Sequence, residues 1–289
     1  MSLVWVNGTL VDKADARVNP FDHGFLYGDG VWEPLRVFGG RLFRPAEHLA
    51  RLAAAAALFD IEIPYSEAEL RAAVETTVGA NHRTDGYCRV VVTRGPGTIG
   101  PDPRKLDPQV FITAEEYCPF PLELYSHGLH VVTCPHPVNT ANPAFWQFAL
   151  GRPDLVLARR HALKAGCLDA VLTDLAGGVI GTTEGELFLV REGTVFAVPP
   201  TSTVEARAAK VLAQRRFPVR HPESVRPPDL AAADEVFLVG TSCGVIGVAR
   251  TDGRDIGTGT EGPVTRAVRE AYRDLTRGSD TMLGEGGAP

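Results

Sequence analysis

Two glycine-containing turns in the first forty residues restrict how the chain can begin to fold. Asn7-Gly8 separates the β-rich runs LVWV and TLV, and Gly39-Gly40 separates LRVF and RLFR. Because these residues tolerate the positive φ angles of two-residue turns, each site predicts a β-hairpin. Pro45 opens a predicted helix, and Ser66 with Glu69 predicts a capping box for the next one. With the strands YCRVVVTRG and PQVFITAEE, this order indicates an α+β layer.

A proline-containing segment of weak periodicity, PFPLELYSH at 119–127, predicts a connection between two domains. We expect an N-terminal α/β domain at 1–118, a linker at 119–127, a C-terminal domain at 128–279 and a tail at 280–289. The second half contains many short strands and several helices, of which GPVTRAVREAYRDLTRG is the last. The predicted class is therefore a two-domain α+β protein.

Composition excludes several classes of function. A net charge of −6 without a basic stripe argues against nucleic-acid binding. The apolar runs are too short to cross a bilayer and the N-terminus has no signal-peptide pattern, so we expect a cytoplasmic protein without a membrane partner. The five cysteines form no C-x-x-C pair, and no metal site is expected.

Longer motifs carry a resemblance to a known family. The stretch VWVNGTLV…HLARL and the segments RVVVTRGPG, FLVGTS and GPVTRAVREAY resemble fold-type IV of the pyridoxal-phosphate enzymes, the class-IV aminotransferases and aminodeoxychorismate lyases. The resemblance implies the D-amino acid aminotransferase-like fold, with a small N-terminal α/β domain and a larger β-barrel-like C-terminal domain with flanking helices. It also implies an active site in a cleft between the domains, and homodimers.

Members of this family hold pyridoxal phosphate through a Schiff-base lysine, and only lysine can form that bond. The chain has four lysines and none between Lys105 and Lys164. Counting back from Gly166, the resemblance places Gln147 or Phe148 at the lysine's position.

Two further cofactor positions differ from the family pattern. Gly181 stands where the resemblance places the glutamate beside the pyridine nitrogen, and Glu186 stands at an asparagine position. The phosphate-binding turn reads TSTVEAR, in which Glu205 adds a negative charge. We therefore predict that the chain uses no cofactor.

Several polar residues still match the family's binding positions. Arg51 matches its phosphate-binding arginine, and arginine forks bind carboxylate as well as phosphate. As catalytic residues we predict Tyr27 as a proton donor and His136, Glu184 or Glu205 as a base. The predicted substrate-binding residues are Arg36, Arg51, Arg89, Arg94, Phe148, Arg152, Arg207, Thr241 and Ser242.

These positions together predict a class-IV aminotransferase-like enzyme, a lyase, isomerase or hydrolase, that acts without cofactor on a small carboxylate-bearing metabolite. One alternative is a pyridoxal-phosphate-dependent aminotransferase or aminodeoxychorismate lyase, for which Lys105 or Lys164 would have to reach the site. Another is a non-catalytic paralogue that binds a ligand or a partner, since a fold does not determine a function.

Overall fold

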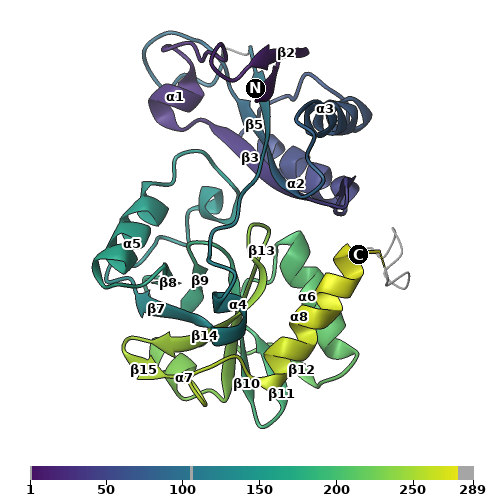
Figure 1. The fold of residues 1–289 in the computed structure, drawn as a ribbon. Helices are drawn as coiled ribbons and strands as arrows, with labels where there is room; N and C mark the ends of the chain where they lie inside the picture. Colours follow the sequence, from purple (N-terminus) through teal and green to yellow (C-terminus); the bar gives the residue numbers. More distant parts are fainter. Residues whose placement is uncertain (1, 105–106, 279–289) are drawn as a thin grey trace. The chain divides into compact units, whose positions relative to one another are not determined.

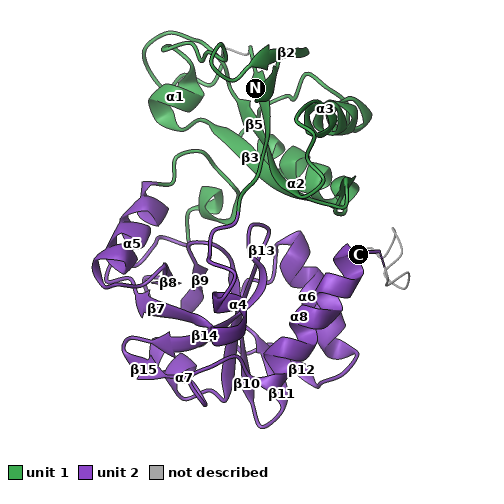
Figure 2. Cartoon of the chain, viewed as in Figure 1, with its two compact units in different colours: residues 1–117, 141–152 green, residues 118–140, 153–289 purple. Residues whose placement is uncertain are grey.

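The computed structural model describes residues 2–104 and 107–278 and divides the chain into two compact units. Unit 1 comprises the residues up to Tyr117 together with Ala141–Arg152, and unit 2 comprises Cys118–Thr140 and the residues from Pro153 onward (Figure 2). Each unit is therefore built from two separate segments. The predicted tail, 280–289, lies outside the described residues.

The prediction of a linker at 119–127 is wrong, because this segment is part of unit 2. Phe120 is fully buried in the core of unit 2, and Leu124–His127 form the short helix α4. Tyr125 donates its hydroxyl hydrogen bond to the carbonyl of Cys243 at 2.8 Å. The apolar side chains between the prolines thus anchor the segment.

Unit 1 is a six-stranded antiparallel sheet with helices packed against it (Figure 1). The sheet order is β2-β1-β6-β5-β3-β4. The strands are β1 (Leu3–Val6), β2 (Thr9–Asp12), β3 (Gly30–Phe38), β4 (Arg41–Leu42), β5 (Gly86–Thr93) and β6 (Gln109–Glu115). The helices are α1 (His23–Tyr27), α2 (Pro45–Leu58), α3 (Glu67–Ala80) and the 3₁₀ helix η1 (Pro143–Trp146).

The local signals of the sequence are confirmed in unit 1. Asn7 and Gly8 have φ angles of 46° and 97° between β1 and β2, and Gly39 and Gly40 have 56° and 76° between β3 and β4. The capping box of α3 forms as predicted, with both of its reciprocal hydrogen bonds present. Residues close together in the sequence therefore determine these two hairpins and the start of α3.

Unit 2 contains the larger sheet, in the order β12-β11-β10-β13-β14-β7-β8-β9 with β15 paired to β14. Its strands are β7 (Leu129–Thr133), β8 (Asp169–Thr173), β9 (Val179–Thr182), β10 (Glu186–Arg191), β11 (Thr194–Ala197), β12 (Val219–Arg220), β13 (Glu235–Gly240), β14 (Gly244–Thr251) and β15 (Arg254–Asp255). Its helices besides α4 are α5 (Pro153–Lys164), α6 (Val204–Gln214), α7 (Pro227–Ala231) and α8 (Pro263–Thr276).

The sheet of unit 2 is curled. β9 lies at one end of the hydrogen-bonded order and β10 lies near the other end. The short turn Thr183–Gly185 nevertheless joins these two strands, so the sheet must curve to bring them together. Both faces carry helices or buried apolar side chains, since β8, β10 and β13 are buried along almost their whole length. This curled sheet with flanking helices confirms the predicted fold class.

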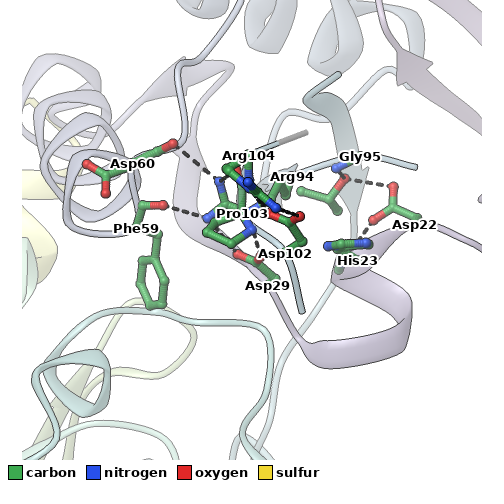
Figure 3. A network of polar contacts seen from close by, with 12 residues as sticks. Asp22, His23, Asp29, Phe59, Asp60, Arg94, Gly95, Asp102, Pro103 and Arg104 are labelled. Carbon is green, nitrogen blue, oxygen red and sulfur yellow. Dashed lines mark hydrogen bonds and ion pairs between the residues drawn. The ribbon is translucent and has the colours of Figure 1, made fainter. Parts of the chain in front are cut away.

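Arg94 fastens three separate segments of unit 1 to one another (Figure 3). Its Nε and Nη2 donate to the carboxylate of Asp29, and Nη2 also donates to the carbonyl of Phe59 at 2.6 Å. Nη1 donates to the carbonyls of Asp60 and Pro103. These five hydrogen bonds use all five N–H groups of the guanidinium. Arg94 is 3% exposed, so its predicted role in binding substrate is replaced by a structural one.

We predict that Arg94→Lys destabilises the protein by about 3–5 kcal/mol, because lysine has only three donors and no planar fork, so that buried acceptors lose their partners. Urea-induced unfolding of the full chain measures this change. Arg104→Lys is the control: Arg104 pairs with Asp102 on the surface, and its replacement should leave the unfolding midpoint unchanged. Equal midpoints for both variants would contradict the structural role of Arg94.

Candidate functional site

The predicted site residues are divided between the two units. Unit 1 contains Tyr27, Arg36, Arg51, Arg89, Arg94, Gln147, Phe148 and Arg152, and unit 2 contains His136, Gly181, Glu184, Glu205, Arg207, Thr241 and Ser242. Each group has its own network of contacts.

The centre of the group in unit 1 is a pair of stacked aromatic rings with a guanidinium group against each ring. The guanidinium carbon of Arg89 lies 4.0 Å from the ring centre of Trp32, and that ring stacks on Phe148 at 4.6 Å with 17° between the planes. The guanidinium carbon of Arg51 lies 4.6 Å from the ring centre of Phe148. Such contacts contribute about 0.5–2 kcal/mol each. We define these four residues as the cation–aromatic stack.

The backbone brings Phe148 into this stack. The segment after η1 runs beside β3, where the N–H of Trp32 donates to the carbonyl of Phe148 at 2.8 Å and Val31 bridges to Ala149. Trp32 was not among the predicted site residues. Trp32 lies four residues before Arg36 in β3, so both side chains point to the same face of the strand. This spacing was the signal that could have identified Trp32.

A buried carboxylate lies next to Arg51. Oε2 of Glu33 lies 3.8 Å from Nη2 of Arg51, and Oε1 accepts a hydrogen bond from Nδ1 of His48 at 2.7 Å. Glu33 and His48 are both almost fully buried. Within the described residues, Nη1 of Arg51 is buried and has no hydrogen-bond partner. Arg51 therefore keeps one donor group that suits an anion.

The other predicted residues of unit 1 have local partners. Arg36 donates to the carbonyl of Tyr117 at 3.1 Å, and Arg152 stacks over the ring of Phe145 at 4.6 Å. The hydroxyl of Tyr27 accepts a hydrogen bond from the N–H of Gly100 at 2.6 Å, and the side chain is 42% exposed.

In unit 2, Thr241 and Ser242 form the turn between β13 and β14, and each donates to a carboxylate. Thr241 donates to Glu205 and Ser242 donates to Glu184, both at 2.8 Å. Arg159 of α5, a residue that was not predicted, lies 3.5 Å from Glu184. The predicted hydroxyl turn thus exists, and its hydroxyl groups bind the protein's own acids.

Asp169, also not predicted, is the first residue of β8 and is fully buried. Its Oδ1 accepts hydrogen bonds from the backbone and side chain of Thr183, and Arg159 lies 3.9 Å away. Burial raises the pKa of Asp169, and the hydrogen bonds from Thr183 only partly oppose that shift. The thiol of Cys243 is also buried, and its pKa is raised mainly by burial and then by Glu184 and Asp169. This cysteine is therefore a poor nucleophile.

Glu186, predicted to stand at an asparagine position, lies at the N-terminus of α6. Its two oxygens accept hydrogen bonds from the backbone N–H groups and the hydroxyl groups of Ser202 and Thr203, at 2.8–3.2 Å. Burial raises the pKa of Glu186, and these hydrogen bonds oppose that shift. Because backbone N–H groups can only donate, the geometry holds the carboxyl group as an acceptor.

The remaining predicted residues of unit 2 are His136, Arg207 and Gly181. His136 is exposed, and Arg207 donates to the carbonyl of Ser202 at 2.9 Å. Gly181 has a φ of 136°, and a Cβ atom there would lie 2.8 Å from the carbonyl oxygen of Gly185. A glutamate at 181 would therefore be strained in this backbone.

No lysine within the described residues is among the contacts of these two groups. Lys13 pairs with Glu115, Lys164 is exposed at the end of α5, and Lys210 lies within α6. Lys105 lies outside the described residues. Positions 147 and 148 hold Gln and Phe, and Phe148 belongs to the cation–aromatic stack.

Among residues 2–104 and 107–278, no three His, Cys, Asp or Glu side chains are arranged to hold a metal ion. The helices in the same ranges are too short or too polar to cross a membrane.

Comparisons with known proteins agree on one family. The family model described as amino-transferase class IV matches residues 30–251. A putative branched-chain-amino-acid aminotransferase of Methanocaldococcus jannaschii is 35% identical, over 94% of this chain and 96% of its own length.

Two solved structures show the similarity in three dimensions. The T.th. branched-chain amino acid aminotransferase with pyridoxamine 5′-phosphate has a TM-score of 0.91 and 27% identity, over 96% of this chain and 95% of that chain. The 4-amino-4-deoxychorismate lyase of Pseudomonas aeruginosa has a TM-score of 0.80 and 27% identity, over 95% of this chain and 100% of that chain.

These findings contradict the prediction that the chain uses no cofactor. A structure that matches nearly the whole chain contains the amine form of the vitamin B6 cofactor, so pyridoxal phosphate is the cofactor that the comparisons indicate. The residues of the chain fit this group in part. Nη1 of Arg51 suits its phosphate, whereas the N-terminus of α6 already holds Glu186 and positions 147 and 148 offer no amine.

We predict that the buried Asp169 makes the protein less stable as the pH rises. A pKa raised in the folded state stabilises the fold below the unfolded value of about 3.9, and this contribution is lost as the pH rises through the folded pKa. The free energy of unfolding of the wild type relative to Asp169→Asn should therefore fall as the pH rises above the unfolded pKa of aspartate, as measured by urea denaturation at a series of pH values.

Asp255→Asn is the matched control with the opposite sign. The pKa of Asp255 is lowered by Arg250, so its contribution is present above the unfolded pKa and is lost as the pH falls. If the wild type gains stability over Asp169→Asn with rising pH, Asp169 is held in its ionised form and the interpretation is wrong.

Proposed function

The chain belongs to the class-IV aminotransferase family, and on that premise we propose that it is an enzyme acting on a small amino acid or the corresponding keto acid with the vitamin B6 cofactor of its relatives. The M. jannaschii relative, named as a putative branched-chain-amino-acid aminotransferase, supports the substrate class. The pyridoxamine phosphate in the T.th. aminotransferase structure supports the cofactor.

The observation that carries the proposal is the state of Arg51. Its guanidinium is held by the ring of Phe148 on one face and by Glu33 at Nη2, and Nη1 remains buried without a hydrogen-bond partner among the described residues. A buried donor without a partner costs about 1–3 kcal/mol, and an anionic ligand removes that cost. We assign the cofactor phosphate or an acidic substrate group to this donor.

Arg36 and Arg89 are the proposed residues for the substrate carboxylate. Arg36 lies opposite Tyr87 in the register of β3 and β5, and Arg89 lies two residues from Tyr87, so the two arginines share one face of the sheet. Planar guanidinium groups recognise carboxylates through paired hydrogen bonds. This face also carries Trp32, whose ring offers an apolar surface to a substrate side chain.

The proposed acid–base residues are Tyr27, His136, Glu184 and Glu205, with Thr241, Ser242, Arg152 and Arg207 as further binding residues. Glu184 is the best-supported candidate for the base, because its side chain is partly exposed and its carboxylate contacts both Ser242 and Arg159. Glu205 is fully buried and bonded to Thr241. A cytoplasmic location and a homodimer, the assembly expected from the family resemblance, belong to the same proposal.

Aminodeoxychorismate lyase activity is the second candidate. The lyase structure of P. aeruginosa matches the chain with the same sequence identity as the T.th. aminotransferase, although with a lower TM-score. A lyase would cleave aminodeoxychorismate without a second substrate, whereas an aminotransferase requires a keto-acid acceptor.

We predict saturable binding of pyridoxal phosphate by the purified chain and transfer of an amino group from a branched-chain amino acid to 2-oxoglutarate. Absorbance titration and product analysis measure the two properties. Arg51→Ala should weaken cofactor binding about tenfold, which corresponds to ~1.4 kcal/mol. Borohydride reduction followed by peptide mass analysis identifies whether any of the four lysines carries the ring.

Arg71→Ala is the matched control, because Arg71 also lies on a helix and pairs with an acid, Glu75, on the surface. Its cofactor affinity should equal that of the wild type. A wild-type chain that binds no pyridoxal phosphate and consumes neither amino acids nor aminodeoxychorismate would overturn the proposal.

A further inference from the structure

One buried carboxylate of unit 1 contacts both a histidine and an arginine of the same helix. Glu33 of β3 is 2% exposed, and His48 of α2 is completely buried. Nδ1 of His48 donates to Oε1 of Glu33 at 2.7 Å, whereas Nη2 of Arg51 lies 3.8 Å from Oε2. His48 precedes Arg51 by three residues, so both side chains lie on one face of α2. The histidine contact is therefore a short hydrogen bond, and the arginine contact is an ion pair beyond hydrogen-bond distance.

The longer contact leaves the N–H edge of Arg51 available. A carboxylate next to a guanidinium commonly pairs with it through two parallel hydrogen bonds, which would occupy that edge. One oxygen of Glu33 is bound to His48 instead, and this pairing is absent. The ring of Phe148 lies against the flat face of the guanidinium, and Nη1 has no hydrogen-bond partner among the described residues. The Arg51 side chain is 19% exposed, so it is not sealed from solvent.

We propose that His48 is a positioning residue for an anion site at Arg51. By binding Glu33, it keeps this carboxylate from forming a bidentate pair with Arg51 and so preserves the N–H groups of the arginine for the anion. His48 acts through Glu33 and Arg51 and does not contact the ligand itself. The inference rests on the proposed function for the assignment of an anionic group to Arg51.

The side chain of histidine suits this task. A neutral imidazole donates from Nδ1 without adding a charge, so Glu33 stays attracted to Arg51 while one of its oxygens is held. A leucine at position 48 would remove the donor, and the buried carboxylate would then gain most by moving onto Arg51. An asparagine carries an amide N–H close to the position of Nδ1 and restores the donor.

The experiment measures binding of inorganic phosphate to the full chain by isothermal titration. Arg51→Ala should weaken binding, and His48→Leu should weaken it about tenfold, because Glu33 then competes for the same N–H groups. His48→Asn should bind phosphate within about threefold of the wild type. Glu33→Gln should strengthen binding about threefold, because it removes the competing charge.

The side-chain Nε–H signal of Arg51 in ¹⁵N spectra gives a second readout that does not depend on added phosphate. Its assignment follows from the loss of one signal in Arg51→Lys. The signal should move in His48→Leu, where Glu33 is expected to approach the guanidinium, and should stay near its wild-type position in His48→Asn. An unchanged signal in a folded His48→Leu variant would contradict the proposal.

A double-mutant cycle separates positioning from a general structural effect. In the Glu33→Gln background, His48→Leu should change the phosphate affinity by less than about twofold, because the effect of His48 passes through Glu33.

Asn81→Ala is the matched control. Asn81 is also a buried polar residue of unit 1, and its side chain forms hydrogen bonds with Leu3 and Thr77. Its replacement should lower the unfolding midpoint and leave the phosphate affinity unchanged.

The proposal is overturned if His48→Leu binds phosphate as tightly as the wild type, or loses as much affinity with Gln at position 33 as with Glu. It is also overturned if Arg51→Ala leaves phosphate binding unchanged. Should His48→Leu fail to fold, Glu33→Gln decides, since weaker or equal phosphate binding by this variant contradicts a competing Glu33.

Failure of this inference is distinguishable from failure of the proposed function. Pyridoxal phosphate binding and amino-group transfer by the wild type test the function, whereas inorganic phosphate binding by the His48 and Glu33 variants tests the positioning of Arg51.

Discussion

A charged side chain is stable inside a protein only where neighbouring groups satisfy its hydrogen bonds, and this requirement organises both units. Arg94 meets it with five acceptors from three segments of unit 1. Glu186 and Glu235 meet it with donors at two helix termini. The buried charges are therefore also the points at which separate segments of the chain are joined.

The same requirement separates structural from functional residues. A charge whose partners are all supplied by the protein has no capacity left for a ligand, as with Arg94. Arg51 differs, because its Nη1 is buried without a hydrogen-bond partner in the described part of the chain. Both residues are arginines of unit 1, and only their surroundings assign one to the fold and the other to anion binding.

The sequence was sufficient for features whose partners lie close together. The Asn7-Gly8 and Gly39-Gly40 hairpins and the capping box at Ser66 follow from residues within a few positions of each other, and the motif order identified the family. Arg94 was assigned wrongly because its partners Asp29 and Phe59 lie 65 and 35 residues away. Asp169 and Arg159 were missed for the same reason, since their partners come from other segments. Trp32 was missed although its place on the same face as Arg36 was a local signal.

The cofactor was the most consequential error. Its absence was deduced from single positions, whereas the comparisons extend over nearly the whole chain. The residues that the chain carries at these positions have structural roles of their own. Gly181 suits a backbone that would strain a glutamate, and Glu186 makes five hydrogen bonds that an asparagine, with one oxygen, could not accept. They therefore describe how this member of the family is built.

Phe148 illustrates how one side chain can orient a neighbouring cation. A guanidinium has a flat face that stacks on aromatic rings and an edge of N–H groups that donates hydrogen bonds. Stacking on Phe148 fixes the face of Arg51 without using its edge, and Trp32 supports the ring from the other side. An aromatic side chain at this position thus orients Arg51 while leaving its donors for an anion. Glu33 takes only Nη2, at 3.8 Å, so the side of the guanidinium that carries Nη1 remains the place where a ligand gains most.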